Sequence, residues 1–194
     1  MKDTRESIIE GARVVFAQKG FRATIKDIAK AAGLSSPSLV FWYFKDKEQL
    51  LLAVASAASP FSHIDELLHS QKTADPLTQL ELVANAYLEA YTDSLERQIL
   101  FQLVGNSTSN FEIRQVLQQQ ISSVISGQVA PLIQRGQTSG QICRYLDAEF
   151  LAQSFLGTLY ALVTRWEVNG HLPWSKETII HQVMGLLRCQ DVAQ

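Results

Sequence analysis

The sequence has few of the features that mark secreted, membrane-bound or metal-binding proteins. It contains two cysteines, Cys143 and Cys189, without paired metal-ligand spacing. We expect both to be reduced thiols, with a redox pair as the alternative. No apolar run approaches the ~18 residues of a transmembrane helix, and the N-terminus lacks the apolar region of a signal peptide. These absences predict a soluble, cytoplasmic protein.

Patterns of catalysis are missing as well. The four histidines are never three or four residues apart, so no helix face presents two imidazoles, and no His-Glu-x-x-His motif occurs. A glycine-rich phosphate loop and a Gly-x-Ser-x-Gly elbow are also absent. The sequence therefore predicts neither an enzyme nor a metal or cofactor site. A helical enzyme with an unrecognised site remains a rival interpretation.

Residues 24–44 form the most informative segment of the chain. Thr24 is expected to cap a short helix, with Asp27 completing a capping box. Gly33 ends that helix, and a second helix starts with Ser36 as its cap. Two short helices joined by a glycine turn predict a helix-turn-helix motif, whose second helix enters the DNA major groove. A buried strand in place of the second helix is the alternative, and the helix caps on both sides argue against it.

Over residues 5–52 the chain resembles the DNA-binding domain of TetR-type transcriptional regulators. The resemblance implies an all-α fold, with a three-helix DNA-binding head over residues 1–52 and a helical ligand-binding and dimerising body over residues 53–194. Two departures from the family pattern are a stretch before Ile28 that is one residue shorter and a turn before Pro37 that is one residue longer. The matching residues are Arg5, Ile9, Ala12, residues 16–21, Asp27, Ile28, Ala29, Ala32, Gly33, Tyr43, Phe44, Lys47 and Leu50.

The resemblance implies phosphate contacts from Thr24, Tyr43 and Lys47. A helix N-terminus with a free hydroxyl suits an anion, and so does a lysine at a helix start. Thr24 is expected to cap its helix in addition to making this contact. The alternatives are a core aromatic for Tyr43 and a solvated surface charge for Lys47. Phe41 stands where the family usually has tyrosine and cannot donate to a phosphate. Trp42 or Tyr43 can take over that contact.

Base reading is predicted to be modest. No Arg, Lys, Asn or Gln lies between Leu34 and Phe44, so the usual bidentate partners of guanine and adenine are missing. Serine hydroxyls bond to several bases and apolar side chains touch thymine methyl groups, so we expect readout through thymine contacts and DNA shape. The predicted contact residues of this segment are Ser35, Ser36, Pro37, Ser38, Leu39 and Trp42.

The net charge of −2 is unevenly distributed. Residues 1–60 carry nine Lys and Arg against six acids, a net charge of +3, and the remainder carries eight against thirteen, a net charge of −5. A basic head on an acidic body fits DNA at one end of the protein. A chance fluctuation is the alternative, because +3 is small.

The rest of the chain is predicted to form successive helices, without strand alternation. The last helix is apolar over more than half of its circumference, which predicts one face toward its own subunit and one toward a partner. A homodimer also suits paired DNA half-sites about 34–36 Å apart, although burial within one subunit is the alternative. The predicted interface residues are Gly157, Ala161, Ile180, Val183 and Leu187. Helices are expected over residues 3–19, from 46 with a kink or restart at Ser59-Pro60, over 76–95, over 111–139 with a kink at Pro131, over 147–169 and over 175–188, with 105–110 as the clearest loop.

A small-molecule pocket is expected between the central helices of the body. Each candidate residue taken alone is more often a core or surface residue, and the sequence does not identify the effector. The predicted lining residues are Tyr87, Tyr91, Phe101, Phe111, Arg165 and Trp166.

Together these patterns predict a ligand-responsive DNA-binding transcriptional regulator, a repressor that acts as a dimer on a palindromic operator. The alternative is a helical small-molecule-binding or adaptor protein with weakened DNA binding. That alternative is motivated by the apolar recognition helix and by Phe41.

Overall fold

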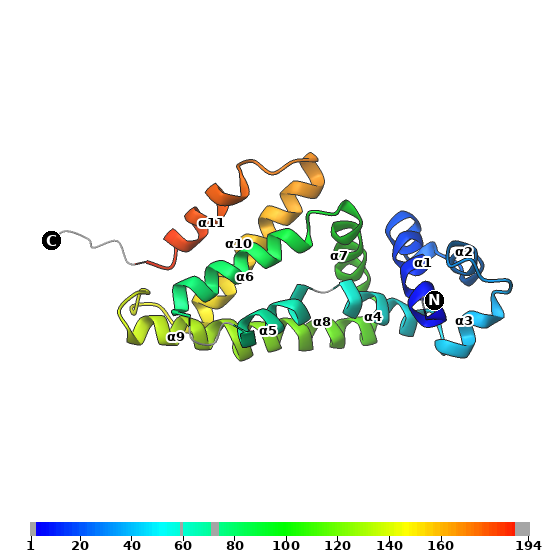
Figure 1. The fold of residues 1–194 in the computed structure, drawn as a ribbon, viewed down its shortest axis with the longest axis horizontal. Helices are drawn as coiled ribbons and strands as arrows, with labels where there is room; N and C mark the ends of the chain where they lie inside the picture. The colour runs from blue at the N-terminus through cyan, green and yellow to red at the C-terminus, as the bar shows by residue number, and fades with distance from the viewer. Residues whose placement is uncertain (1–2, 59, 71–73, 189–194) are drawn as a thin grey trace. The chain divides into compact units, whose positions relative to one another are not determined.

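The computed structural model describes residues 3–58, 60–70 and 74–188, and every regular element within these ranges is helical (Figure 1). The predicted all-α fold is thereby confirmed. No helix in these ranges is long and apolar enough to cross a membrane. The chain divides into two compact units.

Unit 1 contains the predicted three-helix head together with later helices. Its core is one hydrophobic cluster whose fully buried members come from six helices, among them Phe16, Ile28, Leu50, Ile99 and Ile113. Packing therefore joins the head to helices that lie beyond the expected division at residue 52. The elements of unit 1 are α1 (Thr4–Lys19), the 3-10 turn η1 (Gly20–Arg22), α2 (Ile25–Ala31), α3 (Ser38–Tyr43), α4 (Lys47–Ala58), α7 (Ser94–Ser107) and the start of α8 (Phe111–Val124).

The helices α1 and α2 cross in close contact at Gly11. A Cβ atom built on Gly11 would lie 2.7 Å from the backbone nitrogen of Ala32 and 3.0 Å from its Cα. Backbone atoms cannot rotate away as a side chain can, so this crossing requires glycine at position 11.

Helix α7 is fastened to α1 by charge as well as by apolar packing. Arg13 on α1 forms an ion pair with Glu96 on α7 and a second one with Glu10, at 2.7 Å. Glu96 is only 9% exposed. Removing Arg13 would leave a carboxylate buried without its cation, which is costly in a low-dielectric interior.

Unit 2 is organised around α6. This helix packs against four others, and the fully buried side chains of the unit include Leu80, Leu88, Ile133 and Leu159. The elements of unit 2 are α5 (Pro60–Ser70), α6 (Pro76–Ala90), the end of α8, the π-helical segment η2 (Ile125–Val129), α9 (Ala130–Thr138), α10 (Ala148–Asn169) and α11 (Lys176–Gly185).

Of two helix predictions, the first needs correction and the second, the restart at Pro60, is confirmed. The helix expected over residues 76–95 ends at Ala90, because the carboxylate of Asp93 caps a new helix by accepting from the Leu95 N–H at 2.9 Å. At the predicted kink or restart, α4 ends at Ala58 and α5 begins at Pro60; Ser59 lies outside the described residues.

The loop expected over residues 105–110 is helical through Ser107. The side chain of Asn106 donates to the carbonyl oxygen of Gln102 at 2.6 Å, and the guanidinium of Arg114 donates to the carbonyl oxygen of Ser107 at 2.9 Å. Polar side chains that favour loops here bond back to helix carbonyls, so the turn signal in the sequence was misleading.

The bend expected at Pro131 takes the form of a π-helical segment. Residues Ile125–Val129 wind as a π-helix, and Pro131 follows within the first turn of α9. Proline lacks an N–H and its ring clashes with the carbonyl four residues before it. A locally wider winding relieves both problems.

Cys143 is disulfide-bonded, so the prediction that it is a reduced thiol is wrong. The other cysteine of the sequence, Cys189, lies outside the described residues. The N–H of Cys143 donates to the carbonyl oxygen of Leu187 at 2.9 Å, and its own carbonyl accepts from Gln137 at 2.7 Å. The loop after α9 is thereby tied to the turn that follows α11.

Candidate nucleic-acid interface

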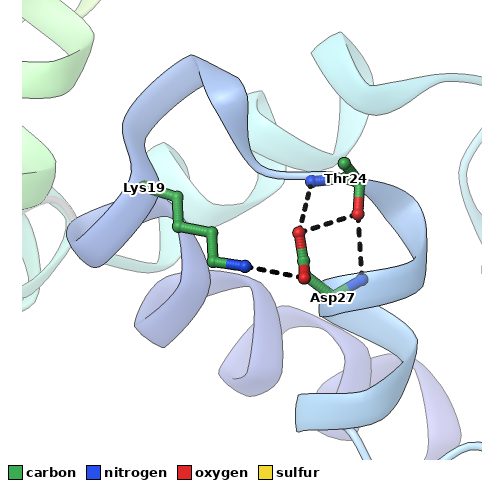
Figure 2. A network of polar contacts seen from close by, with 3 residues as sticks. All are labelled: Lys19, Thr24 and Asp27. Carbon is green, nitrogen blue, oxygen red and sulfur yellow. Dashed lines mark hydrogen bonds and ion pairs between the residues drawn. The ribbon is translucent and has the colours of Figure 1, made fainter.

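The predicted capping box at the start of α2 is present (Figure 2). The Thr24 hydroxyl oxygen accepts from the Asp27 N–H at 3.1 Å, and the Asp27 carboxylate accepts from the Thr24 N–H at 3.1 Å and from the Thr24 hydroxyl at 2.7 Å. The hydroxyl proton of Thr24 is therefore already used within the box. A phosphate contact from that hydroxyl would have to replace its bond to Asp27.

Lys19, at the end of α1, completes this network. Its ammonium group lies 2.7 Å from the second carboxylate oxygen of Asp27 (Figure 2). The hydrogen bonds from Lys19 and then from Thr24 lower the pKa of Asp27 from 3.8 to about 2. Sequence reasoning missed Lys19, because the pair spans two helices and the η1 turn rather than a helical spacing.

The glycine turn of the motif is also confirmed. Gly33 has a φ of +70°, and its N–H donates to the carbonyl of Lys30 at 3.2 Å. The next N–H, of Leu34, donates to the carbonyl of Ala29 at 2.9 Å. This pair of bonds ends α2 as a Schellman motif, whose left-handed residue favours glycine.

The second helix of the motif forms α3, so the alternative of a buried strand is wrong. Val40 and Phe44 anchor α3 in the core, with 0% and 5% exposure. The aromatic residues between them face solvent: Phe41 is 54% exposed, Trp42 84% and Tyr43 44%. A helix held on one side by the core leaves these rings on the surface, which is the arrangement that a groove-binding helix needs.

The serines before α3 bond to one another. The hydroxyl oxygens of Ser36 and Ser38 lie 2.7 Å apart, and Ser36 Oγ also accepts from the Ser38 N–H at 3.3 Å. The helix starts at Ser38, with Pro37 at the cap position, one residue later than predicted. Ser35, Pro37 and Ser38 are exposed and Leu39 is half-buried, so the predicted base-reading residues gather in one short surface segment.

The predicted phosphate contacts all lie in unit 1. Lys47 is the first residue of α4, whose start is capped by Asp46 accepting from the Gln49 N–H at 2.8 Å. Tyr43 is exposed at the end of α3, as a backbone contact requires. The contacts of Thr24, Tyr43 and Lys47 with DNA stay predictions.

The predicted ligand residues are spread over both units. Tyr87 and Tyr91 pack edge to face on α6, with ring centroids 5.0 Å apart and 4% exposure each. Burial raises the pKa of both phenols. Their ligand role stays a prediction, as it does for the other four: Phe101 and the exposed Phe111 belong to unit 1, while Arg165 and Trp166 lie on α10 in unit 2.

The predicted interface residues separate into exposed and buried groups. Gly157 and Ala161 are exposed on α10. Ile180, Val183 and Leu187 are 5%, 2% and 1% exposed within their own subunit. The interpretation of these three as partner-facing therefore needs correction, because almost no surface of their side chains is left to bury.

A helix-turn-helix with an exposed second helix, joined to a helical body, defines a DNA-binding transcriptional regulator. The family model of bacterial regulatory proteins of the tetR family matches residues 8–54, and the model of the YsiA-like protein C-terminal region matches residues 61–187. The chain belongs to the TetR family, as its sequence resemblance implied.

Similar proteins include regulators of fatty acid metabolism. The chain is 28% identical over 168 residues to the fatty acid metabolism regulator protein of Bacillus subtilis, covering 84% of this chain and 82% of that protein. The fold matches FadR from Bacillus halodurans with a TM-score of 0.79, at 22% identity over 96% of this chain and 95% of the other. It also matches Bacillus subtilis FadR in complex with stearoyl-CoA, with a TM-score of 0.73 at 23% identity, over 93% and 96% of the two chains.

Proposed function

We propose that this TetR-family regulator is a repressor that binds a palindromic operator as a homodimer and releases it when an effector binds the helical body. The observation that carries the proposal is the surface of α3. Its core side is fixed by Val40, while Trp42 and Tyr43 stand exposed beside the serines that precede the helix. A protein that binds an operator on the chromosome acts in the cytoplasm.

Direct readout in this proposal is confined to a few contacts. Ser38 and Leu39 face thymine-rich base edges, and the indole N–H of Trp42 donates to the backbone in place of the missing Phe41 hydroxyl. Tyr43 and Lys47 hold the phosphates. Because the Thr24 hydroxyl already donates to Asp27, its part in DNA binding is chiefly to cap α2.

The proposed dimer interface is an exposed stripe on α10 with the adjoining surface of α11. Phe150, Gly157, Ala161 and Val168 are exposed at helical spacing along one side of α10, with Phe150 60% and Val168 79% exposed. Leu186, after α11, is 63% exposed beside a groove of about 380 Å³. Large exposed apolar side chains on a monomer favour burial against a second copy.

The effector class that we propose is a fatty acyl thioester of coenzyme A. Support comes from the match to the YsiA-like C-terminal region and from relatives named as fatty acid regulators, one of them bound to stearoyl-CoA. An effector acts only through different affinities for the DNA-bound and free states, and a coupling of about 1–3 kcal/mol changes operator affinity roughly 5- to 150-fold.

A gel-shift titration against the DNA flanking its own gene, at two salt concentrations, tests the DNA-binding part. The regulator predicts tight, salt-sensitive binding to one preferred sequence. Weak binding that is equal on all sequences would instead favour the adaptor alternative. The same titration with stearoyl-CoA tests the effector. The proposal predicts that stearoyl-CoA abolishes the shifted band, and that an equal volume of buffer without stearoyl-CoA leaves the band unchanged.

A further inference from the structure

Arg5, in the first turn of α1, lies over the ring of Phe44, the residue that caps the end of α3. The central carbon of its guanidinium is 5.2 Å from the centre of the ring, which is within the range of a cation–π contact. The contact brings the start of α1 to the end of α3 (Figure 1). A positive side chain is therefore held beside the helix that we propose to enter the major groove.

The guanidinium of Arg5 is exposed and is not paired with an acid. It forms neither a hydrogen bond nor an ion pair within residues 3–58, 60–70 and 74–188. The carboxylate of Asp3 accepts from the backbone N–H of Arg5 instead, at 3.3 Å, and thereby caps α1. Ile8 and Ile9 occupy the positions where a helical ion pair with Arg5 would form. Because a ring does not use up N–H donors as a carboxylate does, the guanidinium keeps donors for another oxygen.

Phe44 is a fixed support for this cation. Its side chain is 5% exposed and belongs to the core cluster of unit 1. Its N–H donates to the carbonyl oxygen of Val40 at 3.0 Å, which ties it to α3. The face of an aromatic ring carries partial negative charge and attracts a guanidinium. A ring held by the core therefore restricts the long, exposed side chain of Arg5.

Predicted and possible phosphate donors flank Phe44 in the sequence. Tyr43 precedes it and is 44% exposed, Lys45 follows it and is exposed, and Lys47 begins α4. Consecutive Cα atoms are about 3.8 Å apart, so these side chains start close to the ring that Arg5 covers. Hydroxyl, ammonium and guanidinium groups are the donors that most often contact the phosphates of DNA.

We propose that Arg5 binds a phosphate of the operator backbone next to the contacts of Tyr43 and Lys47, and that Phe44 holds its guanidinium there. A guanidinium suits this role because it can bind phosphate oxygens through two parallel N–H bonds. Phosphate contacts fix the register and orientation of a protein on the duplex and carry no sequence information themselves. Arg5 thus positions α1 on the DNA, while the residues of α3 read the bases. The inference rests on the operator binding proposed above.

The test measures operator binding of the full-length protein over a series of salt concentrations, with the sequence that the wild type prefers as the probe. Arg5→Met removes the charge and keeps an unbranched side chain. It should weaken binding about five- to tenfold at low salt and leave the preferred sequence unchanged. The slope of log affinity against log salt concentration should fall by about 0.9 for each subunit bound. Arg144→Met, at an exposed arginine of unit 2, is the matched control and should alter neither affinity nor slope.

A double-mutant cycle tests the part played by Phe44. Phe44→Leu removes the ring and keeps an apolar side chain in the core. It should weaken operator binding in the wild type, and the loss should be smaller in the Arg5→Met background, because the ring acts through Arg5. An equal loss in both backgrounds would show that Phe44 does not hold Arg5.

The possible failures are distinguishable. If the wild type binds all sequences weakly and equally, the proposed function is wrong and the phosphate contact falls with it. If the wild type binds its operator and Arg5→Met has the same affinity and salt slope, the assignment of Arg5 alone is wrong. A lower affinity with an unchanged slope also overturns it, because Arg5 then acts only through the fold of the head. Circular dichroism shows whether each variant is folded.

Discussion

Asp27 is held by side chains on both sides of the turn between α1 and α2. Its carboxylate accepts from Lys19 and Thr24, which lowers its pKa from 3.8 to about 2. Because the folded pKa is below the unfolded one, the stabilisation is complete above pH 4 and is lost as the pH falls from about 4 toward 2. The residue therefore supports the head throughout the neutral range.

This predicts the pH dependence of Asp27→Asn. Between pH 5 and 8 the melting temperature of the variant should lie below that of the wild type by a constant difference. Below pH 4 this difference in melting temperature should shrink. Thermal unfolding followed by circular dichroism over a pH series measures it. Lys26→Met, on an exposed lysine of the same helix, is the control. A margin that stays constant down to pH 2.5 would contradict the network in Figure 2.

Gly11 supports a second prediction at this scale. A methyl group at Gly11 would press on the backbone of Ala32, so Gly11→Ala should lower the free energy of unfolding by about 1–3 kcal/mol. Gly105→Ala is the matched control, since Gly105 is helical with open space around its Cα, and it should be neutral or stabilising by up to about 1 kcal/mol. Urea unfolding measures both, and equal stabilities would refute the close crossing.

At the scale of elements, local chemistry was predictable and long-range packing was not. The capping box of Thr24, the turn at Gly33 and the caps at Asp46 and Asp147 follow from residues within one helical turn of each other, and the structure contains them all. Backbone preferences and side-chain caps act over such short distances.

The features that sequence reasoning missed join residues far apart in the chain. Lys19 reaches Asp27 across a turn, Arg13 reaches Glu96 in another helix, and Gln128 donates to Asp65 across unit 2. No periodicity in a single sequence encodes these pairings. The buried positions of Ile180 and Val183 show the same limit, because an apolar helix face does not reveal whether its own subunit or a partner covers it.

The disulfide at Cys143 predicts an element-scale effect. It reinforces the contact between the loop after α9 and Leu187. Cys143→Ser should lower the free energy of unfolding by about 2–4 kcal/mol relative to the oxidised wild type. Urea unfolding without reductant measures the loss, and adding dithiothreitol should bring the wild type down to the variant. A variant as stable as the oxidised wild type would show that the bond contributes nothing.

At the scale of the whole molecule, the α10 stripe predicts how the chain assembles. Ala161→Glu places a charge among exposed apolar residues, so it should convert the dimer into monomers at micromolar concentration without unfolding unit 2. Ser122→Glu, at an exposed position of α8, carries the same charge change and should remain dimeric. Sedimentation equilibrium measures both masses. A wild-type protein that is already monomeric, or a dimeric Ala161→Glu variant, would argue against this interface.

Two compact units suit a regulator that couples two binding events. One unit contains the helix-turn-helix, the other contains most of the helical body, and α8 contributes residues to both. DNA affinity and effector affinity should therefore respond to different substitutions. In the intact protein, an effector that binds the body should still change the occupancy of the operator.

Selection of binding sites from random DNA tests the role of α3 most directly. The wild type, Ser38→Ala and Leu39→Ala are each used to select sequences, and thermal melting confirms that all three are folded. If α3 reads the operator, the wild type selects a palindrome of two half-sites, and each variant selects a sequence altered at the same positions in both halves. If both variants select the wild-type sequence, α3 is not the reader.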